Sequence, residues 1–156
     1  MSMEGARPQA TLGGWLRSWT DDVADVPEAQ QGAGGLILII EDNERNLKLA
    51  RDLLEIHGFR TAEATDATSG IAMALQLQPD VILMDIQLPD IDGVTALQRL
   101  KADGRTASIP VLAVTAYAMT GDRHRFLNVG FDDYITKPLD VKRFPAQVGA
   151  HCRPRT

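Results

Sequence analysis

The chain of 156 residues lacks several features that would place it outside the ordinary globular proteins. It has one cysteine, Cys152, which excludes an internal disulfide and any cysteine-based metal site. It has no long hydrophobic run, because the aliphatic stretch 36–40 is far too short to cross a bilayer. The amino terminus also lacks the basic start, apolar stretch and cleavage site of a signal peptide. These absences predict a cytoplasmic protein with no membrane segment.

Positive charge is also in short supply. Lysine and arginine number 16 against 21 aspartates and glutamates, which gives a net charge of −5. Nonspecific binding to nucleic acid needs a basic surface, so we expect no direct binding to DNA. The apolar fraction of 44% and the charged fraction of 24% are those of a soluble globular protein. The length allows one domain and a tail.

The first 35 residues lack any strand-like run and are rich in glycine, which predicts a flexible N-terminal extension. One part of it, residues 12–26, has helical spacing and predicts a short helix. This helix either packs back on the domain or frays, or it docks on a partner or a second copy. Its polar face is acidic, which argues against a membrane surface. Its apolar positions, which include both tryptophans of the chain, are Leu12, Trp15, Leu16, Trp19, Val23 and Val26.

From residue 36 onward, strand-like runs alternate with helical periods. The spacing predicts strands over 36–41, 60–64, 81–85, 111–115 and 131–136. It predicts helices over 43–57, from 66 to about 77, from the Asp92-Gly93 turn to about 102, from about 120 to 129, and over 140–150. The first, third and fourth strands are almost entirely apolar, so we expect them to be buried on both faces. That pattern is typical of a parallel sheet.

The alternation predicts an α/β fold over residues 36–150, followed by a tail at 151–156. Right-handed crossovers leave few topologies for such a chain. We expect a flavodoxin-like (βα)5 doubly wound parallel sheet with the strand order 2-1-3-4-5. In that order the first and third strands meet at the switch point, where open α/β sheets bind ligands.

Polar residues follow the predicted strands at the carboxyl edge of this sheet. Glu41 and Asp42 follow the first strand, and Asp85 ends the third. Carboxylates crowded together repel one another unless a cation lies among them. Oxygen ligands favour Mg²⁺, with water and a phosphate completing its shell. We therefore predict a magnesium site at Glu41, Asp42 and Asp85, with the backbone carbonyl of Gln87 as a further ligand.

The same edge can support phosphoryl transfer. Asp85 is the candidate nucleophile, because a carboxylate can attack phosphorus to form an acyl phosphate. Thr115, at the end of the fourth strand, can donate a hydrogen bond to a phosphoryl oxygen. Lys137, after the fifth strand, can pair with the phosphoryl oxygens or, before transfer, with Asp85. Each residue alone is common as a cap, a strand residue or a surface lysine, but together they form one site.

These residues lie in stretches that resemble the bacterial response-regulator receiver domain, over almost everything but the first 35 residues. The resemblance implies phosphorylation of Asp85 by a histidine kinase or a histidine phosphotransfer protein, with Mg²⁺ bound at the acidic pair Glu41-Asp42. Glutamate stands first in that pair, where aspartate is also common. The matching stretches are Ile39-Ile40-Glu41-Asp42-Asn43, Ile82-Leu83-Met84-Asp85-Ile86-Gln87-Leu88-Pro89, Asp92-Gly93, Val114-Thr115-Ala116 and Tyr134-Ile135-Thr136-Lys137-Pro138.

The resemblance also implies a conformational switch at Thr115 and Tyr134. On phosphorylation the hydroxyl would move toward the phosphoryl group and the aromatic ring would turn inward behind it. The Lys137-Pro138 bond would be cis, a state that an X-Pro bond permits. The stretch 115–122 is similar to single-domain receivers of the DivK type and to receivers fused to hybrid histidine kinases.

The resulting hypothesis is a stand-alone response regulator of a two-component or phosphorelay system. It would be a signalling phosphoacceptor and not an enzyme, although it would assist its own phosphorylation and dephosphorylation. It would bind a downstream effector, and could form a homodimer. Met119, Phe126, Tyr134 and Val141 lie near the expected binding face, and we expect Phe126 and Val141 to be core. That face comprises the elements at about 120–129, 131–136 and 140–150.

Two other functions fit part of the pattern. A phosphatase with an aspartate nucleophile would want a second aspartate two residues after Asp85 as its general acid. Gln87 stands there and cannot donate a proton in that role. A pseudo-receiver would serve only as a docking module and would take no phosphate. Steady turnover of a phosphate ester would indicate the phosphatase, and no phosphoryl incorporation would indicate the pseudo-receiver.

Overall fold

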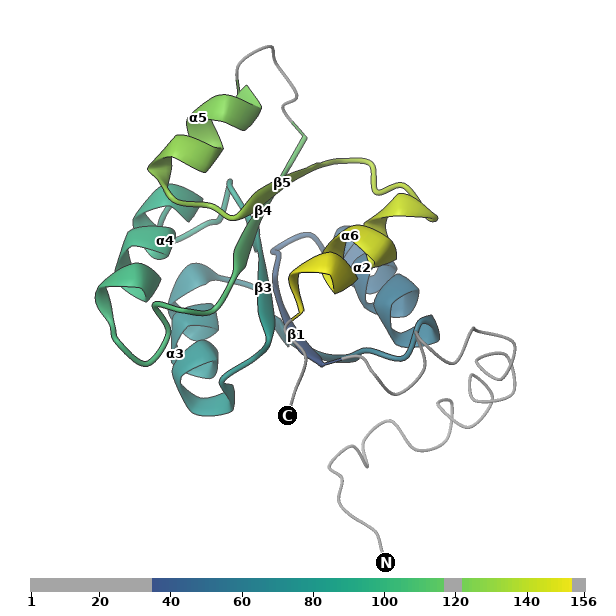
Figure 1. Ribbon diagram of the computed structural model, residues 1–156, viewed down its shortest axis with the longest axis horizontal. Helices are drawn as coiled ribbons and strands as arrows, with labels where there is room; N and C mark the ends of the chain where they lie inside the picture. Colours follow the sequence, from purple (N-terminus) through teal and green to yellow (C-terminus); the bar gives the residue numbers. More distant parts are fainter. Residues whose placement is uncertain (1–34, 117–121, 153–156) are drawn as a thin grey trace, which may run out of the picture.

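The computed structural model describes residues 35–116 and 122–152. The helix predicted over 12–26 lies outside these residues, as do Met119 and the predicted helix start near residue 120. Within the described ranges, five strands alternate with five helices (Figure 1). In chain order these are β1 (Leu36–Ile40), α2 (Glu44–Ile56), β2 (Arg60–Ala64), α3 (Ala67–Leu77), β3 (Val81–Asp85), α4 (Gly93–Ala102), β4 (Val111–Thr115), α5 (Asp122–Val129), β5 (Asp133–Thr136) and α6 (Arg143–His151).

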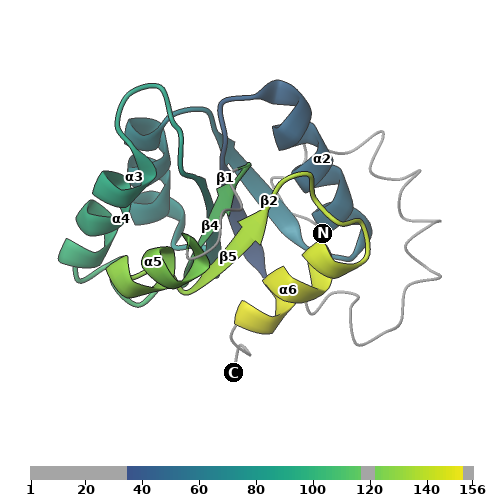
Figure 2. The same ribbon diagram turned by 90° about the horizontal axis from the view of Figure 1, so that it is seen from above.

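The five strands form one parallel sheet in the order β2-β1-β3-β4-β5, which confirms the predicted topology. Helices α2 and α6 cover one face of the sheet, and α3, α4 and α5 cover the other (Figures 1 and 2). The fold therefore has three layers, and the carboxyl ends of all its strands point to one edge. None of the helices in the described part of the chain is long and apolar enough to cross a membrane.

The apolar runs of β1, β3 and β4 are buried on both faces, as predicted. Side chains alternate along a strand, so each run supplies two cores. In β1, Leu38 and Ile40 pack under α3 and α4, whereas Ile37 and Ile39 pack under α2 and α6. This two-sided burial fixes the register of the central strands and hence the position of the residues that follow them.

Caps set the ends of several helices where the sequence predicts them. The side chain of Asp66 accepts a hydrogen bond from the backbone N–H of Ser69 at 2.7 Å, which caps α3. Asn43 caps α2 in the same way, and Gly58 follows that helix with φ of +92°. A positive φ suits glycine, so the chain can turn directly into β2.

Three predictions near the carboxyl terminus are wrong in detail. Strand β5 begins at Asp133, two residues later than predicted, because the side chain of Asp132 accepts a hydrogen bond from the backbone of Val111 at 2.8 Å and forms a turn. Helix α6 begins at Arg143 and not at residue 140, since Asp140 caps the preceding turn. Val141 lies in that turn and is 60% exposed, so it is not core, whereas Phe126 is buried as expected.

One buried acid opposes the stability of the fold. Glu55, on α2, accepts a hydrogen bond from the Thr61 hydroxyl at 2.6 Å through Oε2. Its Oε1 is buried without a hydrogen-bond partner in the described residues. Burial raises the pKa of Glu55, against the opposing effects of Thr61 and Arg51. A raised pKa in the folded state means that ionisation above the unfolded value costs stability.

We therefore expect Glu55→Gln to raise the free energy of unfolding at pH 7 by about 1 kcal/mol, because it removes a buried charge and keeps an acceptor for Thr61. Urea denaturation should show this gain at pH 7 and its loss at acidic pH, where Glu55 is protonated. Glu44→Gln, at an exposed position of the same helix, should give no gain. A stabilisation of similar size in that control would contradict the explanation.

Candidate functional site

Three carboxylates meet where β1 and β3 end. Ile40 pairs with Met84 in the sheet, so the next residues, Glu41 and Asp85, lie side by side at its edge. Carboxylate oxygens of Glu41, Asp42 and Asp85 all lie within 4.8 Å of one another. Glu41 and Asp85 are buried and Asp42 is exposed. The structure thus brings together the acidic residues that the sequence predicts for one site.

Lys137 follows the edge strand β5 and forms ion pairs with both buried carboxylates. Its Nζ lies 2.7 Å from Glu41 Oε1 and 3.2 Å from Asp85 Oδ2. The pairing with Asp85 was predicted, and the closer pairing with Glu41 was not. The Lys137 backbone N–H donates to the carbonyl of Thr115 at 2.8 Å, and the following bond to Pro138 is cis, as the resemblance implied. One side chain therefore links the ends of β1, β3 and β5.

The crowding of these groups changes their proton affinities. Burial raises the pKa of Glu41 to about 7, although the hydrogen bond from Lys137 acts in the opposite direction. Burial alone would lower the pKa of Lys137, but its hydrogen bond to Glu41 and the charge of Asp85 raise it above the ordinary value. Lys137 therefore stays a cation, and Glu41 can hold or release a proton near neutral pH.

Backbone N–H groups orient the two buried carboxylates. The N–H of Asn43 donates to Glu41 Oε2 at 3.1 Å, and that of Gln87 donates to Asp85 Oδ1 at 3.0 Å. Gly93 lets α4 approach this strand end, because a Cβ there would lie 2.9 Å from Ile86 Cα and 3.1 Å from the Asp85 carbonyl oxygen. A larger residue would have to push the segment after Asp85 away from its position.

The two residues predicted as a switch both lie inside the protein. Thr115 ends β4 with its side chain buried, and its pairing with Thr136 keeps it beside β5. Tyr134 is also buried, with its ring stacked on Phe126 at 5.4 Å between centroids. In this structure the ring of Tyr134 is therefore already inward.

The donor set fits a divalent cation that prefers oxygen. Three carboxylates supply negative charge within a small space, and the exposed Asp42 leaves one side open to water. Mg²⁺ needs such oxygen ligands at near-octahedral geometry and keeps several waters. Glu41, Asp42 and Asp85 could hold this ion. The carbonyl of Gln87 stays a prediction as a further ligand.

A contact between the segment after β3 and the start of α3 was not predicted from the sequence. Asp90, in the segment between β3 and α4, accepts hydrogen bonds from the backbone N–H groups of Ala67 and Thr68, both at 2.9 Å. It also accepts one from the Thr68 hydroxyl at 2.6 Å. The sequence marks this segment only as a turn, because nothing local shows that Asp90 reaches the start of α3.

The fold and the acidic site define a class of protein. Residues 37–148 match the response regulator receiver domain, and the chain belongs to that family. Receiver domains of two-component systems are signalling phosphoacceptors that interact with histidine kinases or phosphotransfer proteins and with effectors, and they generally use Mg²⁺.

Individual proteins within this family are similar to the chain over most of their length. The chain is 45% identical to the polar-differentiation response regulator DivK of Brucella anthropi over 108 residues, which are 69% of this chain and 88% of the relative. Among solved structures, it is similar to the receiver domain of the sensor histidine kinase PA1611 from Pseudomonas aeruginosa PAO1, which has a magnesium ion coordinated in its active-site cleft. That match has 32% identity and a TM-score of 0.69, and covers 76% of this chain and 97% of the other.

A CheY-like response regulator receiver domain protein from Methanospirillum hungatei JF-1 has the same fold, at 27% identity and a TM-score of 0.67. The match covers 75% of this chain and 92% of that chain. Together with the parallel sheet and the acidic edge, these similarities support a DivK-like receiver.

The raised pKa of Glu41 predicts that cation binding depends on pH. Below its pKa of about 7 the carboxyl group is mostly protonated, and the proton must leave before the oxygens can bind a metal. We expect the dissociation constant for Mg²⁺ to rise about tenfold between pH 8 and pH 6. Calorimetric titration would measure this. Glu41→Gln should bind more weakly at both pH values and lose the difference, whereas equal wild-type affinities would contradict the assignment.

Proposed function

We propose that this receiver accepts a phosphoryl group on Asp85, in a Mg²⁺-dependent reaction, from the phosphohistidine of a histidine kinase or a phosphotransfer protein. It then passes the signal on by contact with another protein. The observation that carries this proposal is the position of Asp85, buried beside Glu41 and Asp42 and contacted by Lys137 at 3.2 Å. That is the charge arrangement that phosphoryl transfer to a carboxylate needs.

In the reaction, an oxygen of Asp85 attacks phosphorus as the phosphorus–nitrogen bond of the donor breaks. The freed imidazole keeps the electron pair and takes up a proton. Mg²⁺ would neutralise charge on the phosphoryl oxygens. Lys137 would move from the carboxylates to those oxygens, and Thr115 would donate a hydrogen bond to one of them. Such fixed donors are worth several kcal/mol in comparable sites.

The signal would leave through the surface of α5, β5 and α6. Thr115 and Tyr134 lie on the adjoining strands β4 and β5, so a shift of Thr115 toward the phosphoryl group would free space beside β5. Val141, exposed before α6, and Val129, exposed at the end of α5, offer apolar contacts for an effector. A coupling of about 1–3 kcal/mol is typical of such linkage.

The test is the intact mass of the protein after incubation with Mg²⁺ and a small phosphoramidate donor. The proposal expects a gain of one phosphoryl group, which EDTA prevents and hydroxylamine removes. No gain with the small donor or with phosphorylated kinases, together with weak Mg²⁺ binding, would indicate a pseudo-receiver. Continuous release of phosphate from a phosphate ester would instead indicate a phosphatase.

The contact made by Asp90 should support the metal site. Its hydrogen bonds to α3 hold the segment that carries the Gln87 carbonyl, our proposed metal ligand. We expect Asp90→Ala to weaken Mg²⁺ binding about tenfold, as loss of an orienting partner typically does. Calorimetry would measure it.

The matched control is Asp66→Ala, which removes the cap of α3 and keeps the Asp90 carboxylate. It should bind Mg²⁺ like the wild type. An equal loss in both variants would mean that fraying of α3, and not the position of Gln87, weakens the site.

A further inference from the structure

Strand β5 is the last strand of the described sheet, so its backbone pairs on one side only. It pairs with β4, and its other side is the open edge of the sheet. Its carboxyl end leads directly to Lys137, whose Nζ contacts Glu41 and Asp85. A strand bonded along one side shifts more easily than a central strand. The position of Lys137 therefore depends on what holds β5 at its open edge.

Tyr134 presents its backbone to this open edge. The N–H of Lys137 donates to the Thr115 carbonyl of β4 at 2.8 Å. Backbone groups point alternately to the two sides of a strand, so those of Tyr134, three residues earlier, point away from β4. The ring of Tyr134 stacks on Phe126 of α5. Its N–H and carbonyl are thus the groups through which another element can hold this strand.

A polar cluster of Asp133, Gln147 and His151 binds both of these groups. The Tyr134 N–H donates to Asp133 Oδ1 at 2.8 Å, and the Tyr134 carbonyl accepts from Gln147 Nε2 at 3.2 Å. The same amide nitrogen also donates to Asp133 Oδ2 at 3.2 Å, and His151 Nε2 lies 2.9 Å from that oxygen. Gln147 and His151 are four residues apart and hence on one side of α6. The cluster therefore joins α6 to the backbone of Tyr134.

Electrostatics favour this cluster. Burial alone would raise the pKa of Asp133, but hydrogen bonds from His151, from the Tyr134 backbone and from Gln147 lower it below its ordinary value. Because an ionised carboxylate only accepts hydrogen bonds, Nε2 of His151 is the donor. The side chain of Asp133 is 15% exposed and that of His151 is 26% exposed, so water competes weakly for their contact.

Strand β5 connects this cluster to the phosphoacceptor site. Tyr134 and Lys137 are three residues apart, which is about 10 Å along a strand. Ile135 between them is buried. The strand is thus held by α6 near one end and by the two buried carboxylates at the other. A short extended segment transmits a displacement from one end to the other, so release of Tyr134 would shift Lys137.

We propose that Asp133, Gln147 and His151 are positioning residues, which anchor β5 to α6 and thereby fix Nζ of Lys137 beside Asp85. Loss of the cluster should leave the carboxylates at the ends of β1 and β3 in place but let Lys137 move away from them. The anchoring of β5 stands independently, whereas its effect on phosphoryl transfer rests on the proposed function.

Amide hydrogen exchange tests the anchoring without any phosphoryl donor. The amides of Tyr134 and Thr136 both point to the open edge, but among the described residues only the first donates to a side chain. Nuclear magnetic resonance should show the Tyr134 amide exchanging severalfold more slowly than that of Thr136, after correction for intrinsic rates. Gln147→Leu should remove most of this protection, because Asp133 loses an orienting partner. His151→Leu should weaken it as well, and His151→Gln, which keeps a donor at similar reach, should retain it.

The rate of phosphorylation by phosphoramidate at saturating Mg²⁺ tests the effect on Lys137. Gln147→Leu should slow incorporation severalfold. The same substitution in a Lys137→Met background should cause no further slowing, because the group that the cluster positions is then absent. A general loss of stability would instead slow both proteins to the same extent.

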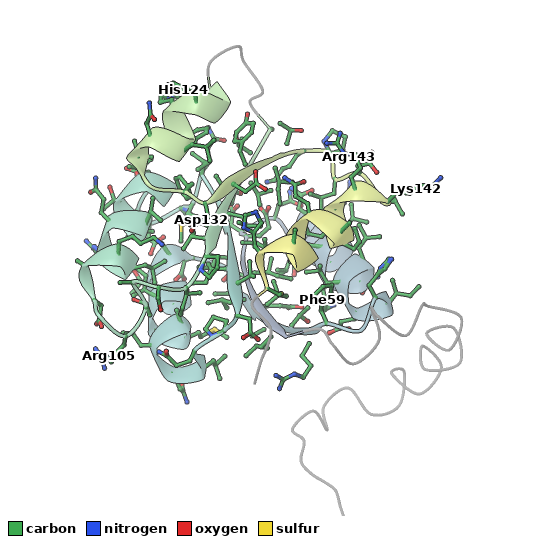
Figure 3. All side chains as sticks on the ribbon, viewed as in Figure 1. Phe59, Arg105, His124, Asp132, Lys142 and Arg143 are labelled. Carbon is green, nitrogen blue, oxygen red and sulfur yellow. The ribbon has the colours of Figure 1, made fainter. Side chains whose placement is uncertain are left out.

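The matched control is Arg143→Gln. Figure 3 shows Arg143 at the start of α6, whereas His151 ends that helix. Arg143 is exposed, so its replacement should leave exchange and rate unchanged, and circular dichroism should show all variants folded.

Three results would count against the proposal. Equal exchange of Tyr134 and Thr136 in the wild type, or an equal effect of Arg143→Gln, would overturn the anchoring. Lost protection with an unchanged rate, or further slowing in the Lys137→Met background, would overturn the effect on Lys137. A wild type that takes up no phosphoryl group would reject the proposed function and with it the effect on phosphoryl transfer, while the exchange rates would still decide the anchoring.

Discussion

Replacing Asp85 with asparagine is expected to abolish phosphoryl incorporation. The amide oxygen is a poor nucleophile and cannot form an acyl phosphate, and the change also removes one of the three clustered carboxylates. Loss of a nucleophile that works with several other groups typically costs at least about a thousandfold in rate.

The comparison needs a control for the loss of one negative charge. Asp52→Asn, on α2 outside the carboxylate cluster, should become phosphorylated like the wild type. Intact mass after incubation with Mg²⁺ and phosphoramidate would distinguish the three proteins, and peptide mapping would locate the group. A phosphoryl group in Asp85→Asn at wild-type stoichiometry would place the acceptor elsewhere and reject the proposed site.

The position of Asp85 at the edge of the sheet could be predicted from sequence for a physical reason. The central strands are short apolar runs, and burial on both faces allows one register only. A polar residue directly after such a run, such as Asp85, must then lie at the carboxyl edge. Glu41 and Thr115 follow the same rule, so the spacing along the chain predicts their proximity in space.

Contacts between side chains far apart in the sequence could not be predicted in this way. Asp90 and Thr68 are 22 residues apart, and their contact depends on how the segment after β3 approaches α3. Lys137 could be expected near Asp85 from the strand order, but its shorter contact with Glu41 depends on side-chain packing. Helix and strand propensities and the hydrophobic period do not predict which side chains from distant segments contact each other.

The start of α6 shows a different limit of prediction from the sequence. Residues 140–142 have helical character in the sequence, yet Asp140 uses its carboxylate to bind the backbone N–H groups of Lys142 and Arg143. The Asp140 carboxylate satisfies these N–H groups from outside the helix, so residues 140–142 form the turn that leads into α6. The helix therefore begins later, and Val141 becomes exposed instead of entering the core.

Both buried carboxylates of the site depend on a single ammonium group. Lys137 contacts Glu41 at 2.7 Å and Asp85 at 3.2 Å, so it partly neutralises the charge that a bound Mg²⁺ would neutralise. An ion bound there would compete with this contact, and Lys137 would then be available to a phosphoryl group. The two roles of Lys137 therefore oppose each other in their effect on metal affinity and on phosphoryl transfer.

Lys137→Met should separate these roles. Without the ammonium group, the carboxylates attract Mg²⁺ more strongly, and we expect its dissociation constant to fall about tenfold, since a charge at this distance contributes a few kcal/mol at most. In the absence of metal, unpaired Glu41 and Asp85 should lower the free energy of unfolding by roughly 2 kcal/mol, a loss moderated by protonation of Glu41. Saturating Mg²⁺ should restore that stability, because the ion binds only the folded site.

Phosphorylation should change in the opposite direction. The variant lacks the cation that stabilises the phosphoryl oxygens, so we expect incorporation from phosphoramidate to slow by about 100-fold even at saturating Mg²⁺. Calorimetry, urea denaturation with and without Mg²⁺, and the time course of intact mass would measure the three effects. Lys142→Met, at an exposed position before α6, should change none of them. Weaker Mg²⁺ binding in Lys137→Met would show that the lysine orients the carboxylates for the ion instead of competing with it.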